Sequence, residues 1–198
     1  MRALQDDLEM LGEDFREVVE AIRESDSLLN RLKGTGMLEA AVAEDLGAVG
    51  IAARATGQGF DARADFPYAA YGEVQFGVVT EEGGDVYARY RVRIREIHQS
   101  FRILNQILTL LPYQKTPLLA TFPSLPARSV SVGMTEGWRG DIVYFVMTDA
   151  GGNTSRVKVR DPSFLNWQLF PYVVTNDVVP DFPLINKSFN LSYTGNDL

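Results

Sequence analysis

The sequence predicts a mainly α-helical, α+β fold in which a bundle of long helices carries a small β-hairpin. Two long segments place apolar residues alternately three and four positions apart, which is the spacing of one face of an α-helix. A β-branched run, followed by turn residues and a second alternating run, is typical of a hairpin. The 198 residues suffice for one domain with a substantial buried core.

Residues 1–33 predict a single long amphipathic helix that ends at Lys33-Gly34. Its other faces are strongly acidic, and Ser25 interrupts its apolar stripe once. Because a helix of about nine turns cannot bury its stripe on itself, we expect it to pack in a bundle or against another chain. The stripe consists of Leu4, Leu8, Leu11, Phe15, Val18, Ile22, Leu29 and Leu32.

Residues 34–84 are punctuated by glycine and contain one short helical candidate, around Ala40–Leu46. The rest has no clear period and is expected to be an ordered loop with turns. Loops of this length are uncommon inside a compact domain and are often functional. Four aromatic residues are expected to hold the loop: Phe60, Phe66, Tyr68 and Tyr71.

A second long helix is predicted over residues 85–111, with Asp85 as its N-cap and Pro112 as its stop. Its polar faces are basic, so the acidic first helix is its natural antiparallel neighbour, and charge is expected to set the pairing. The basic face also suits an anionic ligand, although solvated or ion-paired arginines are the simpler explanation. The arginines are Arg89, Arg91, Arg93, Arg95 and Arg102.

Beyond a proline-rich connector at residues 112–127, a β-hairpin is predicted between residues 139 and 160. Its strands are Asp141–Met147 and Arg156–Arg160, and residues 149–153 have the composition of a turn.

A further helix is predicted over residues 162–174, because Asp161-Pro162-Ser163 has the features of a helix start. Pro171 is expected to end or kink this helix. The tail after it is apolar with two prolines, so we expect it to be irregular and largely buried.

The hairpin should bring Arg139, before its outgoing strand, close to the residues that follow its returning strand. A guanidinium, a helix N-terminus and the Ser163 hydroxyl would then meet at one point. Such an arrangement suits an anion or the polar edge of a cofactor. Ordinary capping and ion pairing among Arg139, Arg160 and Asp161 is the alternative.

The composition excludes several classes of protein. The absence of cysteine excludes a disulfide scaffold, a thiolate-bound zinc or iron–sulfur site and a cysteine nucleophile. His98 is the only histidine and is expected to bond a neighbour on its helix flank, and the net charge of −7 argues against nucleic acid as a partner. No signal-peptide layout and no stretch of about 18 apolar residues is found, which favours a cytoplasmic protein.

Residues 136–174 resemble the C-terminal region of the large subunit of [NiFe]-hydrogenases and of the related 49-kDa-type large subunit of respiratory complex I. The energy-converting, membrane-bound hydrogenases are the most similar branch. Three upstream stretches match in the same order: RLKGTGML at 31–38, ARATG at 53–57 and DFPYAAYGEVQF at 65–76. The resemblance covers residues 31–198.

The resemblance implies that residues 34–198 form the C-terminal domain of such a large subunit, a mainly helical fold that packs on a small subunit holding an iron–sulfur cluster. Membrane subunits would complete the assembly. Arg139 matches the family arginine that reaches toward the iron's diatomic ligands, and Pro162-Ser163 resembles the family pair that hydrogen-bonds to them. The residues expected to line the cavity are Arg139, Asp141, Arg160, Pro162, Ser163 and Asn166.

The departures from the family pattern concern its metal ligands. Ser192 and Gly195 stand where the C-terminal cysteines would be, so this chain is expected not to bind a nickel–iron centre. The family's N-terminal half is also missing, which implies a truncated chain or a half that is encoded separately.

We therefore expect a domain of an NADH-quinone oxidoreductase-like or hydrogenase-related large subunit that lines a quinone-type or vestigial cavity. It would have no cofactor of its own, NAD would bind elsewhere in the complex, and the chain would lie at the inner face of the cell membrane through its partners. The alternative is a non-catalytic scaffold subunit of a membrane-associated redox complex. A pocket converging on Arg139, Arg160 and Ser163 would favour the first function, and a filled core there would favour the second.

Overall fold

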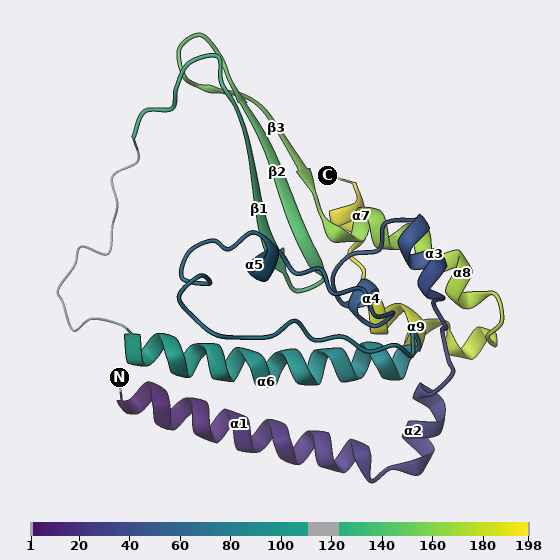
Figure 1. Cartoon of the computed structure of the whole chain (residues 1–198). Coiled ribbons are helices and arrows are strands. Elements are labelled where there is room, and N and C mark those ends of the chain that lie inside the picture. The colour runs from purple at the N-terminus through teal and green to yellow at the C-terminus, as the bar shows by residue number, and fades with distance from the viewer. Residues whose placement is uncertain (1, 111–122, 198) are drawn as a thin grey trace.

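The computed structural model describes residues 2–110 and 123–197. Two long helices lie along one side of the molecule, a three-stranded sheet projects away from them, and the short helices gather at one end of the long pair (Figure 1). The α+β architecture predicted from the sequence is confirmed, with three strands in place of the expected two-stranded hairpin. None of the described helices is both long and apolar enough to cross a membrane.

The N-terminal segment forms two helices, α1 (Arg2–Arg23) and α2 (Asp26–Leu32), so the prediction of a single helix was wrong. Ser25 is the reason, because its backbone is extended and its hydroxyl accepts a hydrogen bond of 3.4 Å from the amide of Leu28. A serine in this position caps a new helix rather than continuing the old one. The chain turns sharply there (Figure 1).

The second long helix, α6 (Val86–Leu110), begins where the sequence predicted. The carboxylate of Asp85 accepts a hydrogen bond of 2.7 Å from the amide of Ala88, which is the geometry of an N-cap. The predicted last residue, Leu111, and the expected stop at Pro112 lie outside the described residues.

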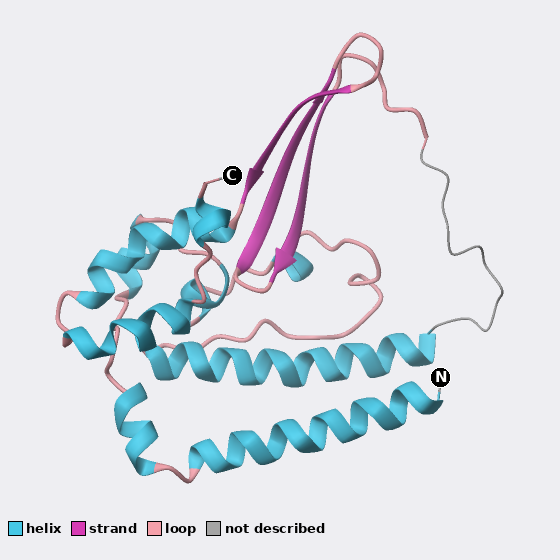
Figure 2. Ribbon diagram, turned by 180° about the vertical axis from the view of Figure 1, so that it is seen from behind, coloured by secondary structure: helices cyan, strands magenta, loops and turns pink. Residues whose placement is uncertain are grey.

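Helices α1 and α6 run antiparallel and side by side, as predicted (Figure 2). No ion pair found among the described residues joins the two helices, and Arg91 and Arg95 pair instead with Glu81 at 3.2 and 2.8 Å. The rings of Phe15 and His98 meet between the two helices at 5.7 Å. An aromatic contact thus joins the two helices, and the role expected for their opposite charges stays a prediction.

The glycine-rich segment contains α3 (Ala40–Asp45), as predicted, and two further short helices, α4 (Gly50–Arg54) and α5 (Ala62–Asp65). Hydrophobic periodicity did not reveal the last two, because four or five residues are too few to show a helical period. All five residues of α4 are buried, so this short helix lies in the centre of the fold.

The sheet consists of β1 (Val130–Gly137), β2 (Gly140–Thr148) and β3 (Thr154–Arg160), antiparallel and in that order. The hairpin of β2 and β3 and its turn at residues 149–153 were predicted, whereas β1 was not. Of the predicted connector at residues 112–127, the part up to residue 122 lies outside the described residues.

The loop before α6 is fastened to β1 by one tyrosine. The hydroxyl of Tyr68 accepts hydrogen bonds from the hydroxyl of Thr135 (2.8 Å) and the amide of Glu136 (3.0 Å), and its ring meets that of Tyr71 at 5.0 Å. Phe66 is 61% exposed, so it does not hold the loop as predicted.

Residues 162–174 are helical throughout, as predicted: α7 (Pro162–Asn166), a 3₁₀ turn and α8 (Phe170–Val174). The 3₁₀ turn ends at Leu169, two residues before Pro171, where the helix was expected to end or kink.

The tail is helical, and of residues 178–193 only Ile185 and Phe189 are buried, so the prediction of an irregular, largely buried segment was wrong. It contains α9 (Phe182–Phe189) and α10 (Tyr193–Asn196). Proline is tolerated in the first turn of a helix, and the buried Ile185 and Phe189 supply the helical spacing. The main core joins α3, α4, α6, α8 and α9, with Leu38, Leu169, Val173 and Ile185 at its centre.

Candidate functional site

The structure brings Arg139 and Asp161 together. Arg139 lies in the two-residue turn between β1 and β2, and its Nη2 lies 3.3 Å from Oδ2 of Asp161 at the start of α7. The convergence expected from the hairpin is therefore present.

A glycine contact positions this turn. A Cβ atom on Gly50 would lie 2.1 Å from the carbonyl oxygen of Arg139 and 2.4 Å from Cα of Gly140, so two backbones touch there. Gly50 also has a φ of 61°, which side-chain-bearing residues rarely adopt. The first residue of α4 therefore holds the turn that carries Arg139.

Asp161 caps α7 and neutralises Arg139. Its Oδ1 accepts a hydrogen bond of 2.8 Å from the amide of Ser163. Burial acts to raise the pKa of Asp161, but hydrogen bonds from Ser163 and Arg139 outweigh it and hold that pKa below its usual value. Asp161 is therefore an anion at neutral pH and a charge partner of the guanidinium.

A second ion pair lies beside the first, between Arg160 at the end of β3 and Asp141 in β2. Three polar atoms of these residues are buried without a hydrogen-bond partner within the described part of the chain: Arg139 Nε, Asp141 Oδ1 and Arg160 Nε. Buried polar atoms are usually paired. The place where the Arg139–Asp161 and Arg160–Asp141 ion pairs meet, which we call the Arg139 junction, therefore retains the capacity to bind a polar group.

Pro162, Ser163 and Asn166 are buried and lie behind the two ion pairs. The amide group of Asn166 forms two hydrogen bonds of 3.1 Å with the backbone of Val49, which fastens α7 to the start of α4. Asn166 therefore holds two helices together and does not face a cavity.

Ser192 and Gly195, which the resemblance is expected to place at the family's cysteine positions, contact Ser163 and Asp161. The hydroxyl of Ser192 caps α10 by accepting a hydrogen bond of 3.0 Å from the amide of Gly195. A Cβ atom on Gly195 would lie 2.7 Å from the carboxylate of Asp161. These residues supply no thiolate and leave no room for one at position 195, so they do not fit a nickel–iron centre. Among the described residues, no group of three His, Cys, Asp or Glu side chains is placed to hold a metal.

Five of the cavities among the described residues are lined by residues other than Arg139, Arg160 and Ser163. Ser163 is fully buried, whereas the side chains of Arg139 and Arg160 are 26% and 37% exposed, so the expected cavity at this point stays a prediction.

A buried charge cluster, which was not predicted from the sequence, lies between α4, α6 and β1. Arg54 is 1% exposed, and its Nε and Nη1 lie 2.7 Å from Glu96 and 3.0 Å from Glu136. The contact with Glu96 is an ion pair whose angles fall outside hydrogen-bond geometry. Asp61 lies 3.9 Å from Arg54 and pairs with Arg63 at 2.6 Å. Arg54 belongs to the ARATG stretch, which is the only signal in the sequence that marks it.

The pKa values of the carboxylates in this cluster shift in two opposite directions. Burial raises the pKa of Glu96 and of Glu136, and the nearby Arg54 offsets this only in part. Burial also acts to raise the pKa of Asp61, but hydrogen bonds from Arg63 reverse the effect and lower it.

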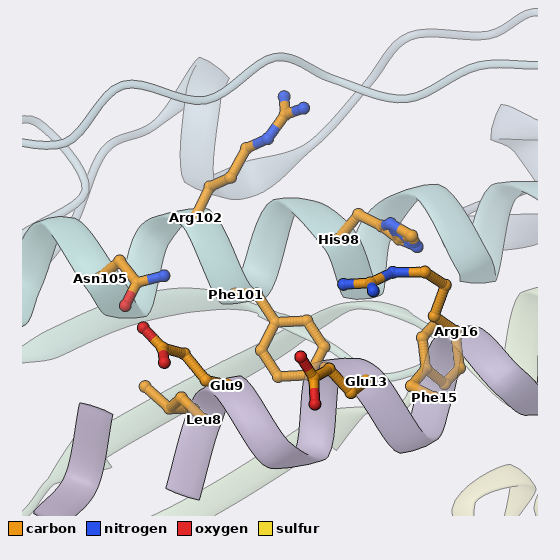
Figure 3. A pocket seen from close by; sticks show the side chains of 10 residues that line it. Leu8, Glu9, Glu13, Phe15, Arg16, His98, Phe101, Arg102 and Asn105 are labelled. Atoms are coloured by element: carbon orange, nitrogen blue, oxygen red, sulfur yellow. The ribbon is translucent and has the colours of Figure 1, made fainter. Parts of the chain in front are cut away.

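His98 lines a cavity of about 350 Å³ between α1 and α6. Figure 3 shows side chains from both helices around it, including Glu13 and Arg16 from α1 and Phe101 from α6. A Cβ atom on Gly12 would meet nothing within 4 Å, which leaves this space open.

The sequence model described as "Respiratory-chain NADH dehydrogenase, 49 Kd subunit" matches residues 1–132 and 120–197. The chain therefore belongs to this family, which confirms the resemblance inferred from the sequence.

Curated relatives come from both branches of the class. The chain is 34% identical to NADH-quinone oxidoreductase subunit 4 of Thermus thermophilus, over 92% of this chain and 51% of the relative. It is 32% identical to the carbon monoxide-induced hydrogenase of Rhodospirillum rubrum, over 88% and 48%. Formate hydrogenlyase subunit 5 of Escherichia coli is 30% identical, over 96% and 33%. The chain thus spans about half the length of these relatives, or less.

A solved structure supports the same fold over the whole chain. A subunit of the membrane-bound sulfane sulfur reductase, an archaeal respiratory membrane complex, superposes with a TM-score of 0.91 at 26% sequence identity. The alignment covers 100% of this chain and 55% of that subunit.

Proposed function

We propose that this chain forms part of the large subunit of a complex I-like or hydrogenase-related oxidoreductase. Its Arg139 junction would be one wall of a quinone-type site that other polypeptide completes. The observation that carries this proposal is the set of three unpaired buried atoms, on Arg139, Asp141 and Arg160. Guanidinium N–H groups of this kind donate to the carbonyl oxygen of a quinone or to an anionic group.

We infer the assembly around this chain from the family to which it belongs. An iron–sulfur small subunit and membrane subunits would be its partners, and it would reach the inner face of the membrane only through them. Any nicotinamide chemistry would belong to another subunit. Two findings support this assignment. A curated relative is about twice as long as this chain, and the similar solved structure comes from an archaeal respiratory membrane complex.

A scaffold role without a redox cavity is the second candidate, favoured by the packing of the junction. Ser163 is fully buried and accepts a hydrogen bond from Ser192, which joins α7 to the start of α10. Asn166 bonds the backbone of Val49, which joins α7 to α4.

The two candidates are separated by variants in the purified native complex. Arg139→Gln and Arg160→Gln should lower quinone-dependent turnover about tenfold while the complex still assembles, since each removes a charged donor. Arg156→Gln, on an exposed part of β3, is the matched control. Unchanged turnover in both junction variants would favour the scaffold role, and stoichiometric nickel by elemental analysis would overturn both candidates.

A further inference from the structure

Helix α1 lies at the edge of the molecule, with α6 along one side of it (Figure 1). None of its 22 residues is buried. Packing of an apolar face supplies most of the stability of a helix in a protein. A helix of this length is therefore expected to have more of its surface covered than α6 covers.

Three residues of the apolar stripe of α1 remain exposed in a row. Leu4, Leu11 and Val18 are 55%, 53% and 58% exposed, and they follow one another at intervals of seven residues. Seven residues make nearly two turns, so the three side chains lie along one side of the helix. A row with this spacing is typical of a helix that packs lengthwise against another helix.

The row lies on the side of the helix pair that faces away from the cavity beside His98. Gly12 of α1 and Asn105 of α6 line that cavity, which Figure 3 shows. The residue before each of them, Leu11 and Leu104, is turned about 100° around its own helix. Because the helices run antiparallel, both rotations lead to the same side of the pair. Leu104 is 42% exposed there.

The apolar surface continues along α6 toward its first turn. Val86 precedes Leu104 by about five full turns, so both side chains lie on the same side of α6. Val86 lines a hollow of about 530 Å³, together with Leu32, Leu184 and Trp138, which is 56% exposed. The exposed row, Leu104 and this hollow thus share one side of the molecule, which we call the α1–α6 apolar face. Exposed apolar patches of this kind are typical of surfaces that bind another polypeptide.

The charges beside the row are negative. Helix α1 contains seven carboxylates and three arginines. Asp7 and Asp14 are exposed, and each lies three residues after a leucine of the row. Among the described residues, Glu20 is the only carboxylate of α1 that forms an ion pair. The face therefore favours a positively charged occupant, and like-charge repulsion disfavours a second copy of α1 or an anionic lipid surface.

We propose that a helix from another part of the large subunit occupies the α1–α6 apolar face. Its own apolar stripe packs on the exposed row, and Lys or Arg side chains lie beside Asp7 and Asp14. The row from Leu4 to Val18 spans about 21 Å, which is the length of about four helical turns. About half the length of the curated relatives lies outside their match with this chain, which supplies a source for the helix. In assigning the helix to a large subunit, this inference rests on the proposed function.

Photo-crosslinking in the purified native complex tests the proposal. Benzoylphenylalanine in place of Leu11 should become joined to a segment outside residues 1–198. Mass spectrometry should identify that segment by apolar residues three and four positions apart with Lys or Arg beside them. Benzoylphenylalanine in place of Val132, which is 63% exposed on β1, is the control and should not reach the same segment.

The partner found at position 11 decides the outcome. A cross-link to a second copy of this chain, to lipid or to a segment with acidic flanks would overturn the proposal, and so would the absence of any cross-link. Equal joining of one segment from positions 11 and 132 would also overturn it. The proposed function fails instead on the turnover of the Arg139 and Arg160 variants, so the two failures are distinguishable.

Hydrogen exchange of the α1 amides in the same complex tests the role of charge. Asp7→Asn combined with Asp14→Asn should speed this exchange about fourfold, because two ion pairs with the partner helix are lost. Glu9→Gln combined with Glu13→Gln removes the same charge beside the cavity shown in Figure 3 and should leave the exchange unchanged. Equal effects of the two double variants would overturn the assignment of a basic partner.

Discussion

The amide of Ser192 donates a hydrogen bond of 3.1 Å to the hydroxyl oxygen of Ser163, 29 residues earlier in the chain. This contact joins the start of α10 to the first turn of α7, directly behind the Arg139–Asp161 pair. A polar contact thus holds α10 against α7 beside the Arg139–Asp161 pair.

Ser163→Ala should lower the free energy of unfolding by about 1–2 kcal/mol, because it leaves the Ser192 amide without its acceptor in a partly buried position. Urea unfolding followed by circular dichroism measures the change. Ser131→Ala, on an exposed strand position, serves as the control and should stay within about 0.5 kcal/mol of the parent. Equal effects in the two variants would show that the Ser163–Ser192 contact contributes nothing.

Gly195→Ala should cost about 1–3 kcal/mol, because its new methyl group would lie 2.7 Å from the Asp161 carboxylate. Gly133→Ala has no neighbour within 4 Å and should cause no loss. The cost at Gly195 should also shrink in an Asp161→Ala background, since the opposing atoms are then gone. Thermal or urea unfolding of the four variants measures these changes in the free energy of unfolding. A loss at Gly195→Ala that is the same with and without Asp161→Ala would show that the carboxylate is not its cause.

The long elements were predictable because their pattern repeats over many residues. The apolar spacing of α6 and its cap at Asp85 are both visible in the sequence, and so is the turn between β2 and β3. Ser25 was visible in the sequence as an interruption of the apolar stripe. The helix breaks there because the Ser25 hydroxyl accepts a hydrogen bond from the Leu28 amide, and apolar spacing carries no information on such a bond.

The site was predictable only as far as topology determines it. A hairpin must bring Arg139 to Asp161, whereas the contact of Gly50 with the Arg139 backbone joins segments about ninety residues apart and leaves no local pattern. The cluster around Arg54 was missed for the same reason, since Glu136 comes from a distant strand. Whether a junction is filled or open depends on packing, which binary patterning does not describe.

Arg54→Met should destabilise the fold by about 3–5 kcal/mol, because it removes the cation paired with the buried carboxylates of Glu96 and Glu136. Arg91→Met is the control. Its guanidinium is half exposed and pairs with Glu81 at 3.2 Å, so its removal should cost less than about 1 kcal/mol. Chemical unfolding at neutral pH compares the two, and a loss at Arg54 no larger than that at Arg91 would contradict a structural role for the buried cluster.

The same cluster predicts how stability changes with pH. Glu96 in the unfolded chain loses its proton near its ordinary pKa of 4.5, whereas burial raises that pKa in the folded chain. Above pH 4.5 the folded state therefore holds more protons than the unfolded state, and the contribution of Glu96 to stability falls as the pH rises through the folded pKa. Asp61 acts in a separate window, because its lowered pKa removes stability only as the pH falls below 3.8.

Glu96→Gln should therefore gain stability relative to the parent as the pH rises from 4.5 toward neutrality, since glutamine has no proton to lose. Unfolding free energies of both proteins, measured in urea at half-unit steps of pH, give this difference directly. Glu17→Gln, on the exposed face of α1, removes one carboxylate far from Arg54 and controls for the change in net charge. A difference for Glu96→Gln that stays constant or shrinks with rising pH would mean that Arg54 outweighs burial, and that Glu96 is as fully ionised in the folded chain as in the unfolded one.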